Sequence, residues 1–156
     1  MNKQWLITWN PNKWLWKDFY KSQAATMQGE CSLHDWTCKS KGPKLGDRVF
    51  LEVLGMNTKR GIIASGEVVA EPYLEMTWRN TVGRKIKVSF DVILPLENVL
   101  PQEILKTRLP ETNWSTQSSG IEIKTALRKN CLETIWRNHV DSFMRGKSSS
   151  VGKAKM

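Results

Sequence analysis

The sequence predicts a single α+β domain in which helices flank a small, strongly curved barrel or open sheet. Several strand-like segments follow one another too closely to form βαβ units. One of them, 85–94, alternates apolar and polar residues along its length. A long segment near the C-terminus carries an apolar stripe at helical spacing. The 156 residues suit one domain, which we place at residues 1–143, followed by a flexible basic tail at 144–156.

The individual elements are expected from local patterns. Strands are β-branched or aromatic runs that end at turn residues. Asn12 suits a helix N-cap, and Pro101 suits the first position of a helix. Residues 33–39 are ambiguous, and Glu71-Pro72-Tyr73 is expected to end a strand. In chain order we expect a strand at 4–9, a helix from 12 to about 26, strands at 48–54, 61–70 and 85–94, a helix at 102–109, a short strand at 121–123 and a helix at 125–140.

The net charge of +9 is moderate, and four of these charges fall within residues 144–156. Such an excess is compatible with a nucleic-acid partner and also with an ordinary basic protein. No apolar run approaches the length of a membrane span, and the first residues resemble a strand rather than a signal peptide. We therefore expect a cytoplasmic protein with no membrane partner.

The three cysteines are Cys31, Cys38 and Cys131. Together with His34, the first two are spaced like metal ligands. A structural zinc site needs a fourth ligand, however, and the only other histidine, His139, lies in the expected C-terminal helix. We expect reduced thiols and no bound metal.

Sequence signatures of common catalytic sites are missing. The chain contains no GxxxxGK[ST], GxGxxG or GxSxG motif. Its two histidines do not adjoin an obvious nucleophile or carboxylate, and a catalytic role for Asp47 or Asp91 has a simpler structural explanation. These observations favour a binding protein that has neither catalytic residues nor a cofactor.

Eight tryptophans are the most unusual feature of the composition. Tryptophan usually packs in a core, but four of these adjoin loop residues and can converge on one pocket. A base stacked on an aromatic side chain is stabilised by about 1–3 kcal/mol. The four are Trp9, Trp36, Trp78 and Trp114.

Small and hydroxyl residues could supply the polar half of such a pocket. Ser65 and Gly66 lie in the middle of an expected strand, which indicates either a bend or a close approach of a ligand to the backbone. The segment 114–120, WSTQSSG, is either a solvated loop or a loop that presents Gln117, Ser118 and Ser119 to a base edge or a phosphate. The candidate phosphate contacts are Lys39, Lys41, Lys44 and Arg79.

A series of short motifs spans residues 3–137. They are Trp9-Asn10-Pro11, Trp14-x-Trp16-x-Asp18, Gly46-Asp47-Arg48-Val49-Phe50-Leu51, Gly61-Ile62-Ile63-Ala64-Ser65-Gly66, Pro72-Tyr73 and Asn113-Trp114-Ser115-x-Gln117-Ser118-Ser119-Gly120-x-x-Ile123. Each is weak alone. In this order and spacing they resemble the EVE domain, in particular the EVE modules that precede HNH nuclease domains in modification-dependent restriction enzymes.

The resemblance implies a PUA-like small mixed β-barrel with flanking helices, in the superfamily that also holds the YTH and ASCH domains. It implies a module that accepts one modified base in an aromatic-lined pocket, with 5-methylcytosine or 5-hydroxymethylcytosine in DNA as the expected ligand. Trp36-Thr37 falls where YTH domains carry a cage tryptophan followed by Ser or Thr.

We therefore expect a non-catalytic reader that flips a modified cytosine of DNA into a tryptophan-lined pocket. Two alternatives remain open, a YTH-like reader of modified RNA bases and a small ASCH-like enzyme that acts on nucleic acid or nucleotides. The sequence contains no HNH nuclease half. Any cleavage would then come from a partner, an effector or a separate nuclease domain.

Overall fold

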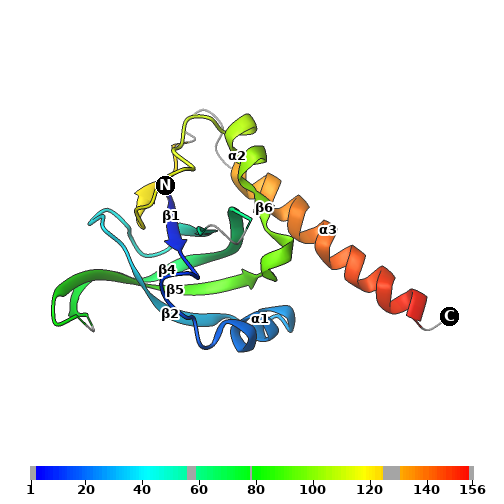
Figure 1. Cartoon of the computed structure of the whole chain (residues 1–156), viewed down its shortest axis with the longest axis horizontal. Helices are drawn as coiled ribbons and strands as arrows, with labels where there is room; N and C mark the ends of the chain where they lie inside the picture. The colour runs from blue at the N-terminus through cyan, green and yellow to red at the C-terminus, as the bar shows by residue number, and fades with distance from the viewer. Residues whose placement is uncertain (1–2, 56–58, 78, 125–130, 155–156) are drawn as a thin grey trace.

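The computed structural model describes residues 3–55, 59–77, 79–124 and 131–154, with side chains described as far as Gly146 (Figure 1). The element order matches the expected order, except that the ambiguous residues 33–39 contribute a strand and two short elements follow β5. The elements are β1 (Gln4–Trp9), α1 (Phe19–Met27), β2 (Ser32–Thr37), β3 (Arg48–Val53), β4 (Gly61–Met76), β5 (Val82–Ile93), a 3-10 turn (Leu96–Asn98), β6 (Leu100–Pro101), α2 (Gln102–Arg108), β7 (Ile121–Glu122) and α3 (Cys131–Ala154).

The strands form one mixed sheet. Within the described residues its order is β2-β5-β4-β3-β1-β7, and β6 pairs with β4. The pair β1–β3 is parallel and the other pairs are antiparallel. The sheet is open, which agrees with the open-sheet form of the expected fold, whereas the PUA-like barrel that the resemblance implies is not closed. The two-residue strand β7 pairs with β1. The segment before β7 meets the segment after β2 through a backbone bond, from Lys39 N–H to the Ser119 carbonyl at 2.8 Å.

Alternation along the strands places apolar side chains on both faces of the sheet, which creates two cores. On one face, Ile7 and Leu51 pack with Phe19 of α1 in what we call the first core. On the other face, Leu6 and Phe50 pack with residues of α2 and α3 in the second core. Helices therefore flank the sheet on both sides, as the α+β class predicts.

The first helix begins later than predicted. Asn12 does not cap it, because α1 starts at Phe19. The Asn10 carbonyl instead accepts the N–H groups of Lys13 and Trp14 at 3.0 and 3.3 Å, which makes an isolated turn. Leu15, expected to be buried, is 76% exposed. The segment before α1 serves aromatic packing rather than a regular helix.

Strand β4 extends beyond Glu71-Pro72-Tyr73 to Met76. Proline cannot donate a ladder hydrogen bond, so it belongs at an edge or a bulge. The β4–β5 register shifts between Val68 and Ala70 and again between Ala70 and Tyr73. These irregularities accommodate Pro72, and the two strands continue beyond it as a projecting hairpin (Figure 1).

Helix α3 continues past the domain boundary expected at residue 143 and ends at Ala154. It buries Leu132 and Trp136 in the second core, as its apolar stripe predicts. The first part of the predicted helix, 125–130, lies outside the described residues. No helix in the described part of the chain is both long and apolar enough to cross a membrane.

Candidate nucleic-acid interface

Trp9, Trp14 and Trp36 pack together into a group that we call the aromatic site. Trp14 is 45% exposed, whereas Trp9 and Trp36 are buried. The Trp14 ring centroid lies 5.2 Å from that of Trp36 and 5.9 Å from that of Trp9. Both distances fall in the range of favourable aromatic contacts. The site therefore presents one indole to solvent and supports it with two others.

Hydrogen bonds hold these rings in place. The Trp36 indole N–H donates to the Thr8 carbonyl at 3.0 Å. The Trp9 indole N–H donates to the Trp14 carbonyl at 3.3 Å, and the Trp14 N–H donates to Asn10. Because both buried indoles have partners, neither ring is free to rotate without losing a bond. The exposed indole is consequently part of a preorganised surface.

A second row of side chains supports the aromatic site. Trp16 meets Trp36 edge-on at a centroid distance of 4.9 Å, and His34 meets Trp16 edge-on at 5.1 Å. The Nε2 atom of His34 forms hydrogen bonds with the hydroxyls of Ser22 and Ser32 at 2.9 and 2.8 Å. Burial lowers the pKa of His34, against the opposing effect of two nearby aspartates. The neutral His34 side chain thus helps to hold the tryptophan rings in place.

Trp14 was absent from the predicted pocket because the sequence placed it inside a helix. The available signal was Asn10-Pro11, a pair of residues that favours a turn. The predicted pocket residues Trp9 and Trp36 both contact Trp14, and exposed Thr37 directly follows Trp36. Sequence reasoning therefore found the buried part of the aromatic site and missed its exposed part.

Trp114 does not join the aromatic site. It is 1% exposed and packs in the second core, on the opposite face of the sheet. Its indole N–H donates to the Leu109 carbonyl at 2.7 Å, and its own carbonyl accepts from Gln102 at 2.7 Å. Trp78 lies outside the described residues. Among the described residues, the expected convergence is therefore corrected: Trp9 and Trp36 contact Trp14, and Trp114 lies apart from them.

The loop that contains Trp114 returns to the aromatic site at Ser119. The Ser119 hydroxyl donates to the Thr37 carbonyl at 2.6 Å and accepts from the Thr8 N–H at 3.1 Å. This side chain therefore joins β1 to the end of β2. Of the other predicted loop residues, Gln117 is exposed and Ser118 is partly buried. Both precede Ser119 in the chain, and the Ser118 N–H donates to the Thr116 hydroxyl at 3.0 Å.

Ser65 and Gly66 lie away from the aromatic site, which corrects their expected role as pocket residues. The Ser65 hydroxyl donates to Asp91 at 2.6 Å, and the Gly66 carbonyl accepts from Arg48 at 3.1 Å. Arg48 also pairs with Asp91 at 3.0 Å and with Glu133 of α3. A Cβ at Gly66 would lie 2.6 Å from the Ser89 carbonyl. Ser65 and Gly66 thus allow β4 to pair closely with β5, next to the polar cluster that Arg48 forms with Asp91 and Glu133 of α3.

A buried polar network anchors the beginning of the loop. Glu52 of β3 is fully buried, and its Oε2 lies 3.4 Å from the Gln102 amide and 3.7 Å from Arg60. Arg60 also donates to the carbonyls of Trp114 and Thr116. Burial raises the pKa of Glu52 to about 8, against the opposing charge of Arg60. Sequence reasoning missed this acid, although one Glu within the apolar run RVFLEV was a usable signal.

The predicted phosphate contacts are all exposed: Lys39, Lys41, Lys44 and Arg79. The first three follow β2 in the loop that leads to β3, and Arg79 lies in the turn between β4 and β5. The Arg84 guanidinium of β5 holds the start of the first region, because it donates to the Lys39 carbonyl at 2.8 Å. Lys39 is thus placed directly beside the Thr37–Ser119 contact.

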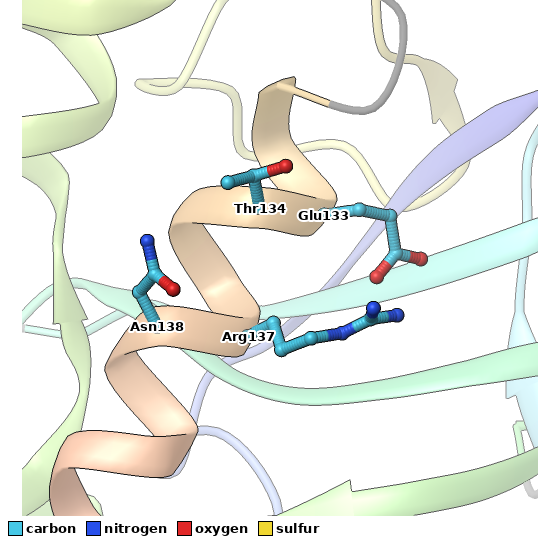
Figure 2. A pocket seen from close by; sticks show the side chains of 4 residues that line it. All are labelled: Glu133, Thr134, Arg137 and Asn138. Carbon is cyan, nitrogen blue, oxygen red and sulfur yellow. The ribbon is translucent and has the colours of Figure 1, made fainter.

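A hollow of about 460 Å³ lies elsewhere, along α3, and is lined by Glu133, Thr134, Arg137 and Asn138. Figure 2 shows that these four side chains come from neighbouring turns of this helix. Glu133 is already paired with Arg48. The hollow includes no residue of the aromatic site and no predicted site residue.

The residues spaced like metal ligands do not come together. Cys31 is exposed, and buried Cys38 directs its thiol to the Ser40 carbonyl at 3.6 Å. Burial raises the pKa of the Cys38 thiol. His34 is occupied by two serines, as described above. Among the residues that the structure describes, no three His, Cys, Asp or Glu side chains are grouped to hold a metal ion.

Comparisons with known proteins support the fold and do not give a function. Protein-family models and curated proteins yield no match. Among solved structures, the chain is similar to protein Atu2648 from Agrobacterium tumefaciens, with a TM-score of 0.56 and 17% sequence identity. The similarity covers 88% of this chain and 92% of that protein. At this identity it shows a shared fold alone.

Proposed function

We propose that this chain is a non-catalytic reader that binds one unstacked, modified base of a nucleic acid at the aromatic site. The observation that carries the proposal is the position of Trp14, a 45% exposed indole supported by two buried ones. An exposed indole held in this way offers a flat surface on which a base can stack. The EVE resemblance favours 5-methylcytosine or 5-hydroxymethylcytosine in DNA as the base.

Polar groups on neighbouring segments, at the end of β2 and in the 114–120 loop, are the candidates for base recognition. Thr37 and Gln117 are exposed, and Ser118 directly precedes the residue that binds the Thr37 carbonyl. Hydroxyl and amide groups can both donate and accept, so they can read the polar edge of a base. Nearby Lys39 can hold a flanking phosphate. Extruding a base costs a few kcal/mol, which stacking of about 1–3 kcal/mol and these contacts must together exceed.

A titration of oligonucleotides tests the proposal. Duplexes of one sequence that contain cytosine, 5-methylcytosine or 5-hydroxymethylcytosine at a single position are compared with the corresponding RNAs by fluorescence anisotropy. The modified DNA should bind most tightly. Trp14→Ala should weaken that binding about tenfold, which corresponds to about 1.4 kcal/mol of lost stacking.

Leu15→Ala is the matched control, because Leu15 is the next residue and is 76% exposed. It should bind as the unchanged protein does. Equal affinity for modified and unmodified DNA, together with a harmless Trp14→Ala, would refute the proposal. Tighter binding of a modified RNA would instead identify an RNA reader in the same site.

A further inference from the structure

The projecting end of the β4–β5 hairpin, which we call the arm, comprises the described residues 73–77 and 79–85 (Figure 1). Its strands pair from Tyr73–Lys85 to Met76–Val82. At the turn, the Thr77 N–H donates to the Thr81 carbonyl at 2.6 Å. The two threonine hydroxyls also bond each other at 2.6 Å. The described residues of the arm therefore form a strand pair whose ends are joined by the Thr77–Thr81 bonds.

One face of the arm is apolar and exposed. Leu74, Met76 and Val82 are 66%, 55% and 63% exposed. Met76 lies opposite Val82 and Leu74 lies opposite Arg84, so all four side chains share one face. Three neighbouring apolar side chains on a projecting hairpin are typical of a surface that contacts a partner.

This face continues the face of the sheet that carries the aromatic site. Val82, Arg84 and Ile86 alternate along β5, and side chains two residues apart point to the same side of a strand. Ile86 belongs to the first core and pairs directly with Trp36. The apolar face of the arm is consequently on the same side of the sheet as Trp36.

The base of the arm is fixed to the edge of the aromatic site. The Cys38 N–H donates to the Arg84 carbonyl at 3.0 Å, and the Arg84 guanidinium donates to the Lys39 carbonyl at 2.8 Å. The Tyr73 hydroxyl donates to Asp35 of β2 at 2.6 Å. These bonds attach the base of the arm to β2 and to the residues after it, close in the chain to Trp36.

The charge of the arm and its base suits a polyanion. Residues 73–87 contain four Lys or Arg side chains and a single acid, Glu75. Lys85 lies 3.9 Å from Glu75 and Lys87 lies 3.9 Å from Asp35 of β2, so part of this charge is balanced by ion pairs. The lysines of the 39–44 loop follow directly after the arm's contact with β2. Apolar side chains flanked by cations match stacked bases flanked by phosphates.

Accepting the proposed function, we propose that the arm inserts into the nucleic-acid duplex beside the extruded base. Met76 and Val82 at its end occupy the space that the base leaves in the stack. Leu74 contacts the adjoining sugar and base edge, and the cations flanking this apolar face hold the phosphates of the duplex. The arm thereby lowers the free-energy cost of extrusion, since apolar side chains replace part of the lost stacking.

The test compares a fully paired duplex with a single strand that contains the same modified base. The double variant Met76→Ser/Val82→Thr should bind the paired duplex about tenfold more weakly, because only the duplex has a stack to open. It should bind the single strand within about twofold of the unchanged protein, because no extrusion is needed there. A duplex with an abasic site opposite the modified base should restore part of the loss.

Leu33→Ser is the matched control, since Leu33 is a 62% exposed strand residue outside the arm. Thermal denaturation verifies that each variant is folded, and Met76→Ala serves as a milder variant if the double substitution unfolds the chain. Duplex affinity equal to that of the unchanged protein, or an equal loss on duplex and single strand, would overturn the role of the arm alone. Failure of the unchanged protein to prefer modified DNA in either form would overturn the proposed function and this inference with it.

Discussion

The substitution Glu52→Gln tests the buried network beneath the loop that leads to Ser119. Glu52 has no solvent exposure, and its two contacts through Oε2 are long, at 3.4 and 3.7 Å. Its Oε1 atom has no hydrogen-bond partner among the residues that the structure describes. Burial raises its pKa from 4.5 to about 8. Between these two pH values the folded chain holds a proton that the unfolded chain has released.

The sign of the effect follows from proton linkage. Stability falls with rising pH wherever the folded state binds more protons, so this carboxyl stabilises the fold below pH 4.5 and loses that contribution as the pH rises to about 8. The full span corresponds to a free energy on the order of 5 kcal/mol. Glutamine resembles the protonated acid in shape and does not titrate. The variant should therefore gain stability relative to the unchanged protein as the pH rises.

Urea denaturation at pH 5 to 9 measures this difference directly. The free energy of unfolding of Glu52→Gln minus that of the unchanged protein should grow between about pH 5 and pH 8 and then level off. Glu67→Gln, at an exposed position of β4, is the control and should give a nearly constant difference. Parallel curves for Glu52→Gln and the unchanged protein, or a difference that shrinks with pH, would show that Glu52 is ionised throughout and that pairing with Arg60 outweighs burial.

Three further predictions concern the loop and the tryptophans. Ser119→Ala should lower the free energy of unfolding by about 1–3 kcal/mol, because two backbone groups lose their hydrogen-bond partner. Ser118→Ala should change it little, and equal effects of the two substitutions in urea denaturation would contradict this role of Ser119. Gly120→Ala should cost more than about 1 kcal/mol, since φ is 99° and the added Cβ would lie 2.5 Å from the Cys38 thiol; an unchanged melting temperature would refute the close contact. Trp114→Ala should cost about 3–5 kcal/mol of stability without ligand, whereas Trp14→Ala should cost much less because Trp14 is 45% exposed; thermal melts should rank them in this order.

The element order followed from the sequence because its signals are local. The alternation of 85–94 corresponds to a strand in which Ile86, Val88 and Phe90 are buried. The apolar stripe of the last helix corresponds to buried Leu132 and Trp136. Turn residues and the period of apolar side chains act over a few residues, so they can be read without knowing which strands pair.

Whether a residue belongs to the aromatic site depends on which face of the sheet its side chain occupies. Trp36 and Trp114 have similar loop neighbours in the sequence, yet one belongs to the first core and the other to the second. Ser65 was expected to face a ligand, but its hydroxyl donates a hydrogen bond to Asp91. Composition does not distinguish the two faces of a strand, because a shift of one residue in register exchanges them.

The sequence by itself determined the α+β class, the order of the elements and the importance of tryptophan. Tertiary structure decided that the sheet stays open, that Ser119 joins its two edges, and that Trp14 rather than Trp114 is presented beside Trp36. The physical reason is the range of the interactions involved. Propensity and alternation are local, whereas sheet closure and aromatic packing join segments that lie far apart in the chain and depend on register and curvature.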